Sequence, residues 1–269
     1  MSVKDVALWM SRRTLRKVPE VTLYFWIVKL LTTAMGESTS DYLVYHINPY
    51  IAVVLGGVGL VVALIVQFLA RRYVPWIYWL AVTMVAIFGT MAADVVHIVF
   101  GVPYLASTAF FAVALAVIFT AWYATEGTLS IHSIHTPRRE LFYWATVMAT
   151  FALGTAAGDM TAATLGLGYF SSGILFALLF AVPALARWRF GLNEILAFWF
   201  AYIMTRPFGA SFADWFGKPI LGGLGLGDTK VSSVLTILII AFVAYLSVSR
   251  RDIRVEQPAL APRGEASIR

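Results

Sequence analysis

Apolar residues dominate long stretches of this chain, and short polar or charged breaks separate the stretches. Cutting the chain at these breaks leaves eight apolar segments of about 18–25 residues, the length that an α-helix needs to cross a bilayer. The segments cover residues 22–45, 50–70, 74–99, 104–125, 140–164, 169–186, 194–216 and 229–249. The pattern therefore predicts an all-α polytopic membrane protein with eight transmembrane helices.

A spacing motif repeats four times along the chain. It consists of a Trp, a Gly ten residues later and an Asp fifteen residues after the Trp, with a small residue just before the Asp. The copies are Trp26/Gly36/Asp41, Trp79/Gly89/Asp94, Trp144/Gly154/Asp159 and Trp199/Gly209/Asp214. Constant spacing in four copies indicates an internal repeat. Each copy lies in the first of two consecutive predicted spans, so each repeat is predicted to form a helical hairpin.

Two spans per repeat give all four hairpins the same orientation, so they are parallel repeats related by axes along the membrane normal. A ring or a pair of pairs is the simplest arrangement, and the motif favours the first helix of each hairpin as the one lining the centre. We place the repeats at about 22–72, 73–137, 138–191 and 192–251, in a membrane domain of residues 22–249.

Composition supports the membrane assignment. The 269 residues are 60% apolar and 13% charged, and the mean hydropathy is +0.81. A water-soluble domain of this size does not need so much apolar surface, which excludes that class. The chain has no Cys, so disulfides and thiolate metal sites are excluded as well.

Lys and Arg are distributed unevenly between the two sides of the predicted bundle. Sixteen of the twenty fall in the two terminal segments and in the connections between repeats. The other side holds Lys218 and Lys230, while Lys29 and Arg206 lie within spans. The positive-inside rule therefore places both termini in the cytoplasm. The net charge of +6 reflects this topology and does not indicate nucleic-acid binding.

Both ends of the chain differ from the predicted membrane domain. Residues 1–21 lack a small-residue cleavage site and are predicted to form a cytoplasmic segment, with a short helix on the inner membrane surface. Residues 252–269 are polar and contain Pro, and they are predicted to be a disordered cytoplasmic tail.

Three features of the repeats suggest structural roles. Aromatic residues surround each motif Trp near the cytoplasmic end, which favours an interfacial anchor. Each motif Gly has a second small residue four positions later, as Gly36 and Ser40 show, and this spacing allows helices to approach closely. The glycine-rich connection from Gly217 to Asp228 is predicted to be the most mobile outer segment.

The motif Asp residues lie within predicted spans, about 10 Å outward from the middle of the helix. An ionisable group in a span costs several kcal/mol and normally faces the protein interior or a wet cavity. Because residues four apart share a helix face, stepping back from each Asp defines a stripe. The stripes are Lys29, Thr33, Glu37 and Asp41; Val82, Ala86, Thr90 and Asp94; Val147, Phe151, Thr155 and Asp159; and Tyr202, Arg206, Ala210 and Asp214. Charge is thus concentrated in the first and fourth repeats.

The chemistry of these groups allows several interpretations. Clustered carboxylates with hydroxyls nearby are hard oxygen ligands suited to Mg, Ca or Mn, and they are also able to carry protons. The candidate ligands are Glu37, Asp41, Asp94, Asp159 and Asp214, with Lys29 and Arg206 tuning the charge. A static salt-bridge network, or Asp residues that only bond the outer turns, remains an alternative.

Other polar groups need weighing too. His132 and His135 have a spacing found in metal sites, but without Cys nearby a loop role is favoured, and His97 is expected to be a satisfied polar group at a span end. The stretch Gly225-Leu226-Gly227-Asp228 matches the GxGD motif of intramembrane aspartyl peptidases, which need a second Asp, such as Asp214.

The chain resembles the bacterial membrane proteins built from four tandem two-span repeats of unknown function, each with a characteristic Trp. The stretches that carry the resemblance are VPEVTLYFWIVKLLTTAMGESTSDYL, TLSIHSIHTPRRELFYW and FALGTAAGDMTAATLGLGYF, within coverage of residues 18–252. The resemblance implies the eight-span architecture and a bacterial inner membrane. It implies no activity, and no catalytic residue is carried over.

The leading hypothesis is transport of a small cation, either a divalent metal such as Mn or a proton-coupled ion, through the lipid bilayer. The cation is then a substrate and not a cofactor. The alternatives are a GxGD-type peptidase that uses Asp228, and a structural or regulatory membrane protein without transport.

Overall fold

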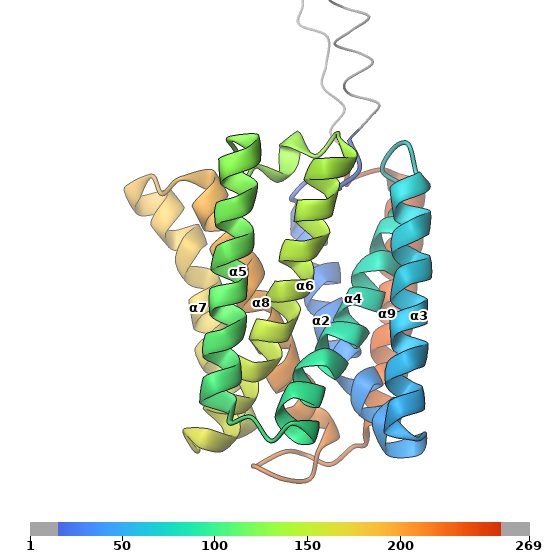
Figure 1. Cartoon of the computed structure of the whole chain (residues 1–269), viewed down its shortest axis with the longest axis vertical. Helices are drawn as coiled ribbons and strands as arrows, with labels where there is room; N and C mark the ends of the chain where they lie inside the picture. The colour runs from blue at the N-terminus through green and yellow to red at the C-terminus, as the bar shows by residue number, and fades with distance from the viewer. Residues whose placement is uncertain (1–15, 254–269) are drawn as a thin grey trace, which may run out of the picture.

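Residues 16–253 are described by a computed structural model, and this part of the chain contains α-helices, two π-helical turns and no strand (Figure 1). Its eight long helices are α2 (Leu23–His46), α3 (Pro49–Leu69), α4 (Pro75–Asp94), α5 (Tyr104–Glu126), α6 (Pro137–Asp159), α7 (Gly168–Phe190), α8 (Glu194–Gly217) and α9 (Asp228–Ser249). The π-helical turns η1 (Val95–Val99) and η3 (Met160–Thr164) extend α4 and α6, and a short 3-10 helix, η2 (Ile131–Ser133), precedes α6. Each predicted apolar segment therefore corresponds to one long helix.

Six of these helices are long and apolar enough to cross a membrane. The other two, α2 and α8, are as long but carry charged residues in their centres, Lys29 and Glu37 in one and Arg206 in the other. The outer helices leave many large apolar side chains exposed, as Val54, Val58 and Val61 of α3 do. An exposed apolar surface of this extent is stable in lipid, so the fold is that of a polytopic membrane protein.

The first helices of the four repeats form a closed central ring, in which α2, α4, α6 and α8 each contact the next and α8 returns to α2. The second helices lie outside the ring (Figure 1). The expectation that each repeat packs as a hairpin is wrong in one respect. Each second helix packs mainly on the first helix of the following repeat: α3 on α4, α5 on α6, α7 on α8, and α9 on α2. The repeats are thus interlocked around the ring.

The repeated glycines explain how the central helices come so close. Each motif Gly faces the side chain seven residues after the Trp of the next repeat, and a Cβ at any of these glycines would lie less than 3.0 Å from that residue. The pairs are Gly36 with Ala86, Gly89 with Phe151, Gly154 with Arg206, and Gly209 with Thr33. The prediction that the glycines allow close helix packing agrees with these contacts.

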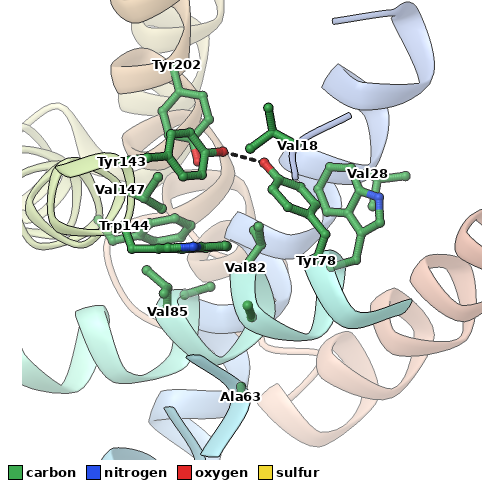
Figure 2. Close-up of a cluster of buried hydrophobic side chains, with 14 of the residues drawn as sticks. Val18, Val28, Ala63, Tyr78, Val82, Val85, Tyr143, Trp144, Val147 and Tyr202 are labelled. Atoms are coloured by element: carbon green, nitrogen blue, oxygen red, sulfur yellow. Dashed lines mark hydrogen bonds between the residues drawn. The ribbon is translucent and has the colours of Figure 1, made fainter. Parts of the chain in front are cut away.

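The repeated tryptophans follow the same cyclic rule. The aromatic residue before each motif Trp contacts the Trp of the next repeat, with ring centroids 5.7–6.3 Å apart. The pairs are Phe25 with Trp79, Tyr78 with Trp144, Tyr143 with Trp199, and Phe198 with Trp26. The interfacial-anchor interpretation is wrong for Trp79, Trp144 and Trp199, which are at most 4% exposed. These aromatic pairs form a buried collar around the axis, part of which Figure 2 shows.

Both ends of the described chain lie at the same end of the bundle, together with the connections between repeats (Figure 1). We call this end, which carries most of the Lys and Arg residues, the basic end of the bundle, and buried polar contacts stabilise it. Lys17 forms an ion pair with the buried Glu140 at 2.6 Å, and Glu140 also accepts a hydrogen bond from Gln67 at 3.0 Å. The predicted N-terminal surface helix and the disordered tail fall largely on residues 1–15 and 254–269, outside the described part of the chain.

The glycine-rich connection between α8 and α9 is ordered by its own backbone hydrogen bonds. The amide of Leu224 donates to the carbonyl of Trp215, and the amide of Gly227 donates to the carbonyl of Gly217. The carbonyl of Leu221 also accepts from the amide of Tyr169 at the start of α7. The connection therefore holds Lys218, its first residue, in a defined place.

Candidate functional site

The four stripes predicted from the sequence all face the axis of the ring. Twelve of their sixteen residues lie in the three inner layers, which contain no residue more than 4% exposed. The outermost layer consists of the four motif Asp residues, of which Asp41 and Asp214 are buried and Asp94 and Asp159 are half-buried. A column of polar groups thus follows the axis from Lys29 to the outer end of the ring.

Arg206 connects all four central helices. From α8, its guanidinium donates to the carboxylate of Glu37 and the carbonyl of Thr33 on α2. It also donates to the hydroxyls of Thr90 on α4 and Thr155 on α6. The side chain is fully buried. Its Nη2 lies within hydrogen-bonding distance of three acceptors, on Glu37, Thr90 and Thr155, and shares its two N–H groups among them. Arg206 is therefore both the counter-charge of Glu37 and a structural tie at the centre of the ring.

A cluster of carboxylates lies at the outer end of this column. Glu37, Asp41 and Asp214 each offer an oxygen, and these oxygens lie within 4.8 Å of one another. Lys218 reaches into the cluster, with its ammonium 2.9 Å from Asp41 and 2.8 Å from Asp214. We call Glu37, Asp41 and Asp214 the outer carboxylate cluster. It is the group of side chains, among the described residues, that could hold a metal ion.

Electrostatics keep Lys218 charged in this position. Burial alone disfavours the ammonium, but the carboxylates of Asp214, Asp41 and Glu37 outweigh burial and raise the pKa of Lys218 well above its usual range. With all groups ionised, the axial column holds five carboxylates and three cations. Two negative charges then remain in excess.

Asp94 and Asp159 occupy equivalent places in the second and third repeats but differ in local structure. Each ends its α-helix and is followed directly by a π-helical turn, whereas α2 and α8 continue without one. These two carboxylates are not part of the outer carboxylate cluster. The predicted set of five ligands therefore divides into three that meet and two that stand apart.

Lys29 lies at the inner end of the column and is 1% exposed. Its ammonium has no hydrogen-bond acceptor among the described residues and instead lies over two aromatic rings. It is 3.9 Å from the ring centroid of Phe151 and 4.2 Å from that of Tyr202. Beyond it, the hydroxyls of Tyr78 and Tyr143 hydrogen-bond to each other, with Tyr202 beside them (Figure 2).

Sequence reasoning missed Lys218, which it assigned to the outer surface. The signal was present, because Lys218 is four residues beyond Asp214 and so continues the stripe of the fourth repeat by one step. It also missed that the tyrosines before the motif Trp in the second and third repeats turn inward toward the axis.

The three histidines singled out in the sequence lie at a helix end and in a connection between helices. His97 stacks on Tyr104, and its Nδ1 lies 2.6 Å from the carbonyl oxygen of Val102, as expected of a satisfied polar group at a helix end. His132 and His135 lie in the connection before α6, where His132 approaches Glu20 and Glu194 at 3.8 Å. Neither belongs to the group of described residues that could hold a metal.

The peptidase alternative requires Asp228 to face a second Asp. Asp228 begins α9, and its carboxylate lies against Gly217. Asp214, the proposed partner, is instead paired with Lys218. A carboxylate held by an ammonium is not free to share a proton with another carboxylate, so this geometry does not favour an acid–base pair.

A family model described as a repeat of unknown function (DUF347) matches the chain four times, at residues 24–73, 77–128, 142–192 and 197–252. The four matches confirm the resemblance and the number of repeats inferred from the spacing motif. Comparisons with curated proteins and with solved structures gave no match. The matched segments cover most of the chain, which therefore belongs to the DUF347 repeat family.

Proposed function

We propose that this protein transports a small cation across the bacterial inner membrane and that the outer carboxylate cluster is its binding site. The observation that carries the proposal is the convergence of three carboxylate oxygens on the axis of a closed helical ring. Hard oxygen ligands of this kind suit Mg, Ca or Mn. We take Mn²⁺ as the reference substrate.

The position of Lys218 supports a cation as the substrate. Its ammonium lies between Asp41 and Asp214, so the cluster already receives one positive charge from the protein itself. An entering metal ion competes with Lys218 for the same oxygens. Lys218 then acts as a tethered cation that balances the cluster when no substrate is bound.

We further propose that α2 and α8 cross the membrane with the six more apolar helices. Each has 24 residues and spans about 36 Å, which exceeds the hydrocarbon thickness of about 30 Å. Their charges face the axis, where they meet one another and not lipid. The basic end of the bundle then lies in the cytoplasm with both termini.

The inner half of the axis is filled by side chains, because the buried Phe151 and the aromatic collar lie between the outer carboxylate cluster and the basic end. A cation bound at the outer carboxylate cluster cannot pass this packing without rearrangement. The arrangement therefore favours a carrier, which opens alternately to each side of the membrane, and not a channel with a continuous pore.

Thermal stability of the purified protein tests the binding site, since an ion that binds only the folded state raises the melting temperature. We expect Mn²⁺ to raise it in the natural protein and not in Asp41→Asn. Asp228→Asn is the matched control and should respond like the natural protein. Mn²⁺ uptake by liposomes should follow the same order.

Two outcomes would contradict the proposal. One is a melting temperature that does not respond to Mn²⁺, Mg²⁺ or Ca²⁺ in the natural protein. The other is loss of the response in Asp228→Asn but not in Asp41→Asn, which would place the bound ion at Asp228 and not at the outer carboxylate cluster.

A further inference from the structure

The least explained charge in the molecule is Lys29. It is buried at the inner end of the axial column, and its ammonium has no hydrogen-bond acceptor among the described residues. The equivalent positions in the other repeats are Val82, Val147 and Tyr202, none of which supplies a counter-charge. An ammonium held only by aromatic rings is far less well solvated than one in water, so it is able to lose its proton.

Lys29 shares an aromatic ring with Arg206. The ring centroid of Phe151 lies 3.9 Å from the ammonium of Lys29 and 5.5 Å from the guanidinium carbon of Arg206. The two cations are therefore within about 9 Å of each other, where repulsion between unit charges changes an equilibrium about twentyfold at an effective dielectric constant of ~20. The ion pair between Arg206 and Glu37 weakens this repulsion.

The other groups around Lys29 do not act on its charge in the way that Arg206 does. The titratable neighbours of Lys29 are Tyr202 and Arg206 from α8, and the hydrogen-bonded pair Tyr78 and Tyr143 of α4 and α6 lies next to Tyr202. The helix α9, which also packs on α2, buries only apolar side chains. Arg206 is thus the charged group, among the described residues, whose state controls the field at Lys29.

Glu37 belongs both to the ion pair with Arg206 and to the outer carboxylate cluster. A cation that takes Glu37 as a ligand withdraws its charge from Arg206. The positive charge of Arg206 is then less well balanced, and it acts on Lys29 across the shared ring of Phe151.

We propose that Lys29 releases a proton when a cation binds at the outer carboxylate cluster, so that the protein exchanges protons for cations. The inference rests on the proposed function. The ammonium of Lys29 becomes a neutral amine, and its proton passes to water at the basic end. Release of the cation reverses the step.

Calorimetric titration with Mn²⁺ in buffers of different ionisation enthalpy counts the protons released per bound ion. We expect Lys29→Met to release about one proton fewer than the natural protein while still binding Mn²⁺. Lys29→Arg keeps a positive charge that cannot be released, so it should show the same deficit if the Met variant fails to fold. Lys230→Met changes an exposed lysine in the same way and should match the natural protein.

The outcomes separate the two proposals. Retained Mn²⁺ binding with an unchanged proton count in Lys29→Met or Lys29→Arg would overturn the role of Lys29 alone. Absence of Mn²⁺ binding in the natural protein would overturn the proposed function and this inference with it.

Discussion

The contact between Gly154 and Arg206 allows a quantitative test of the ring. A Cβ at Gly154 would lie less than 3.0 Å from the side chains of Arg206 and Pro207. One turn later on the same helix, a Cβ at Gly158 would meet its nearest neighbour at 3.8 Å, which is ordinary van der Waals contact. Gly154→Ala and Gly158→Ala are thus the same change in the same buried helix, with and without a clash.

The magnitude follows from this comparison. Replacing Gly by Ala inside a helix stabilises it by roughly 0.5–1 kcal/mol, and this gain is common to both variants. Overpacking at Gly154 costs about 1–3 kcal/mol, so the difference between the two variants should be of that size. At about 2–4 °C per kcal/mol, Gly154→Ala should melt about 2–12 °C below Gly158→Ala.

The assay is thermal unfolding of the detergent-purified variants, followed by tryptophan fluorescence. Gly158→Ala should be at least as stable as the natural protein. Equal melting temperatures for the two variants would refute the cyclic packing of each motif Gly against the next repeat. Gly209→Ala should fall as far as Gly154→Ala, because its added Cβ would clash with Thr33.

Three further predictions concern individual polar groups. Arg206→Met removes one partner of a buried ion pair and should lower the free energy of unfolding by about 3–5 kcal/mol, measured by thermal unfolding; a stable variant would show that Glu37 is not held by this pair. Lys218→Met removes the competing cation and should tighten Mn²⁺ binding. Each of its two ion pairs is worth ~0.2–1 kcal/mol, which together correspond to a roughly 2- to 30-fold change in affinity. Calorimetry measures this affinity, and weaker binding would contradict competition. Tyr73→Phe removes the hydroxyl that donates to Asp252 at 2.5 Å and should cost about 1.5–3 kcal/mol at neutral pH, where Tyr123→Phe at an exposed site should cost nothing. Burial raises the pKa of Asp252 above its ordinary value, so its contribution to stability falls as the pH rises from that ordinary value through the raised one. Tyr73 donates to the ionised carboxylate, so Tyr73→Phe raises the pKa of Asp252 further; its deficit should be absent in acid and develop as the pH rises through and above the raised pKa, and a deficit independent of pH would refute this account.

The elements and the axial stripes could be predicted because they depend on local periodicity. Apolar segments long enough for a bilayer marked the helices, and a spacing of four residues placed Lys29, Glu37 and Asp41 on one face. A charged residue within a span is normally turned toward the protein interior, so the sequence also predicted that this face points inward.

The cyclic order of packing could not be predicted in the same way. Apolar matching between helices does not specify whether a second helix packs on its own repeat or on the next one, since both choices bury similar surfaces. The same ambiguity explains the error at Trp79, because an amphipathic ring near a helix end suits an interface as well as a core. Lys218 was misplaced because it follows the last residue of α8, so its position became clear only when the stripe of the fourth repeat was continued past the end of the helix.

The four repeats are equal in their framework and unequal in their chemistry. The Trp, Gly and Asp of the motif recur in every repeat, and the contacts of the Trp and Gly recur around the whole ring. The positions between them differ, and they place Glu37 on α2 opposite Arg206 on α8. Those two helices meet where the ring closes, so the first and last repeats are neighbours in space although they are farthest apart in the chain. In a symmetric ring the identical carboxylates would repel one another. Here the contact between α2 and α8 brings together both the acidic groups and the cations that balance them. The framework therefore builds the ring, and the divergence of the first and fourth repeats makes the site.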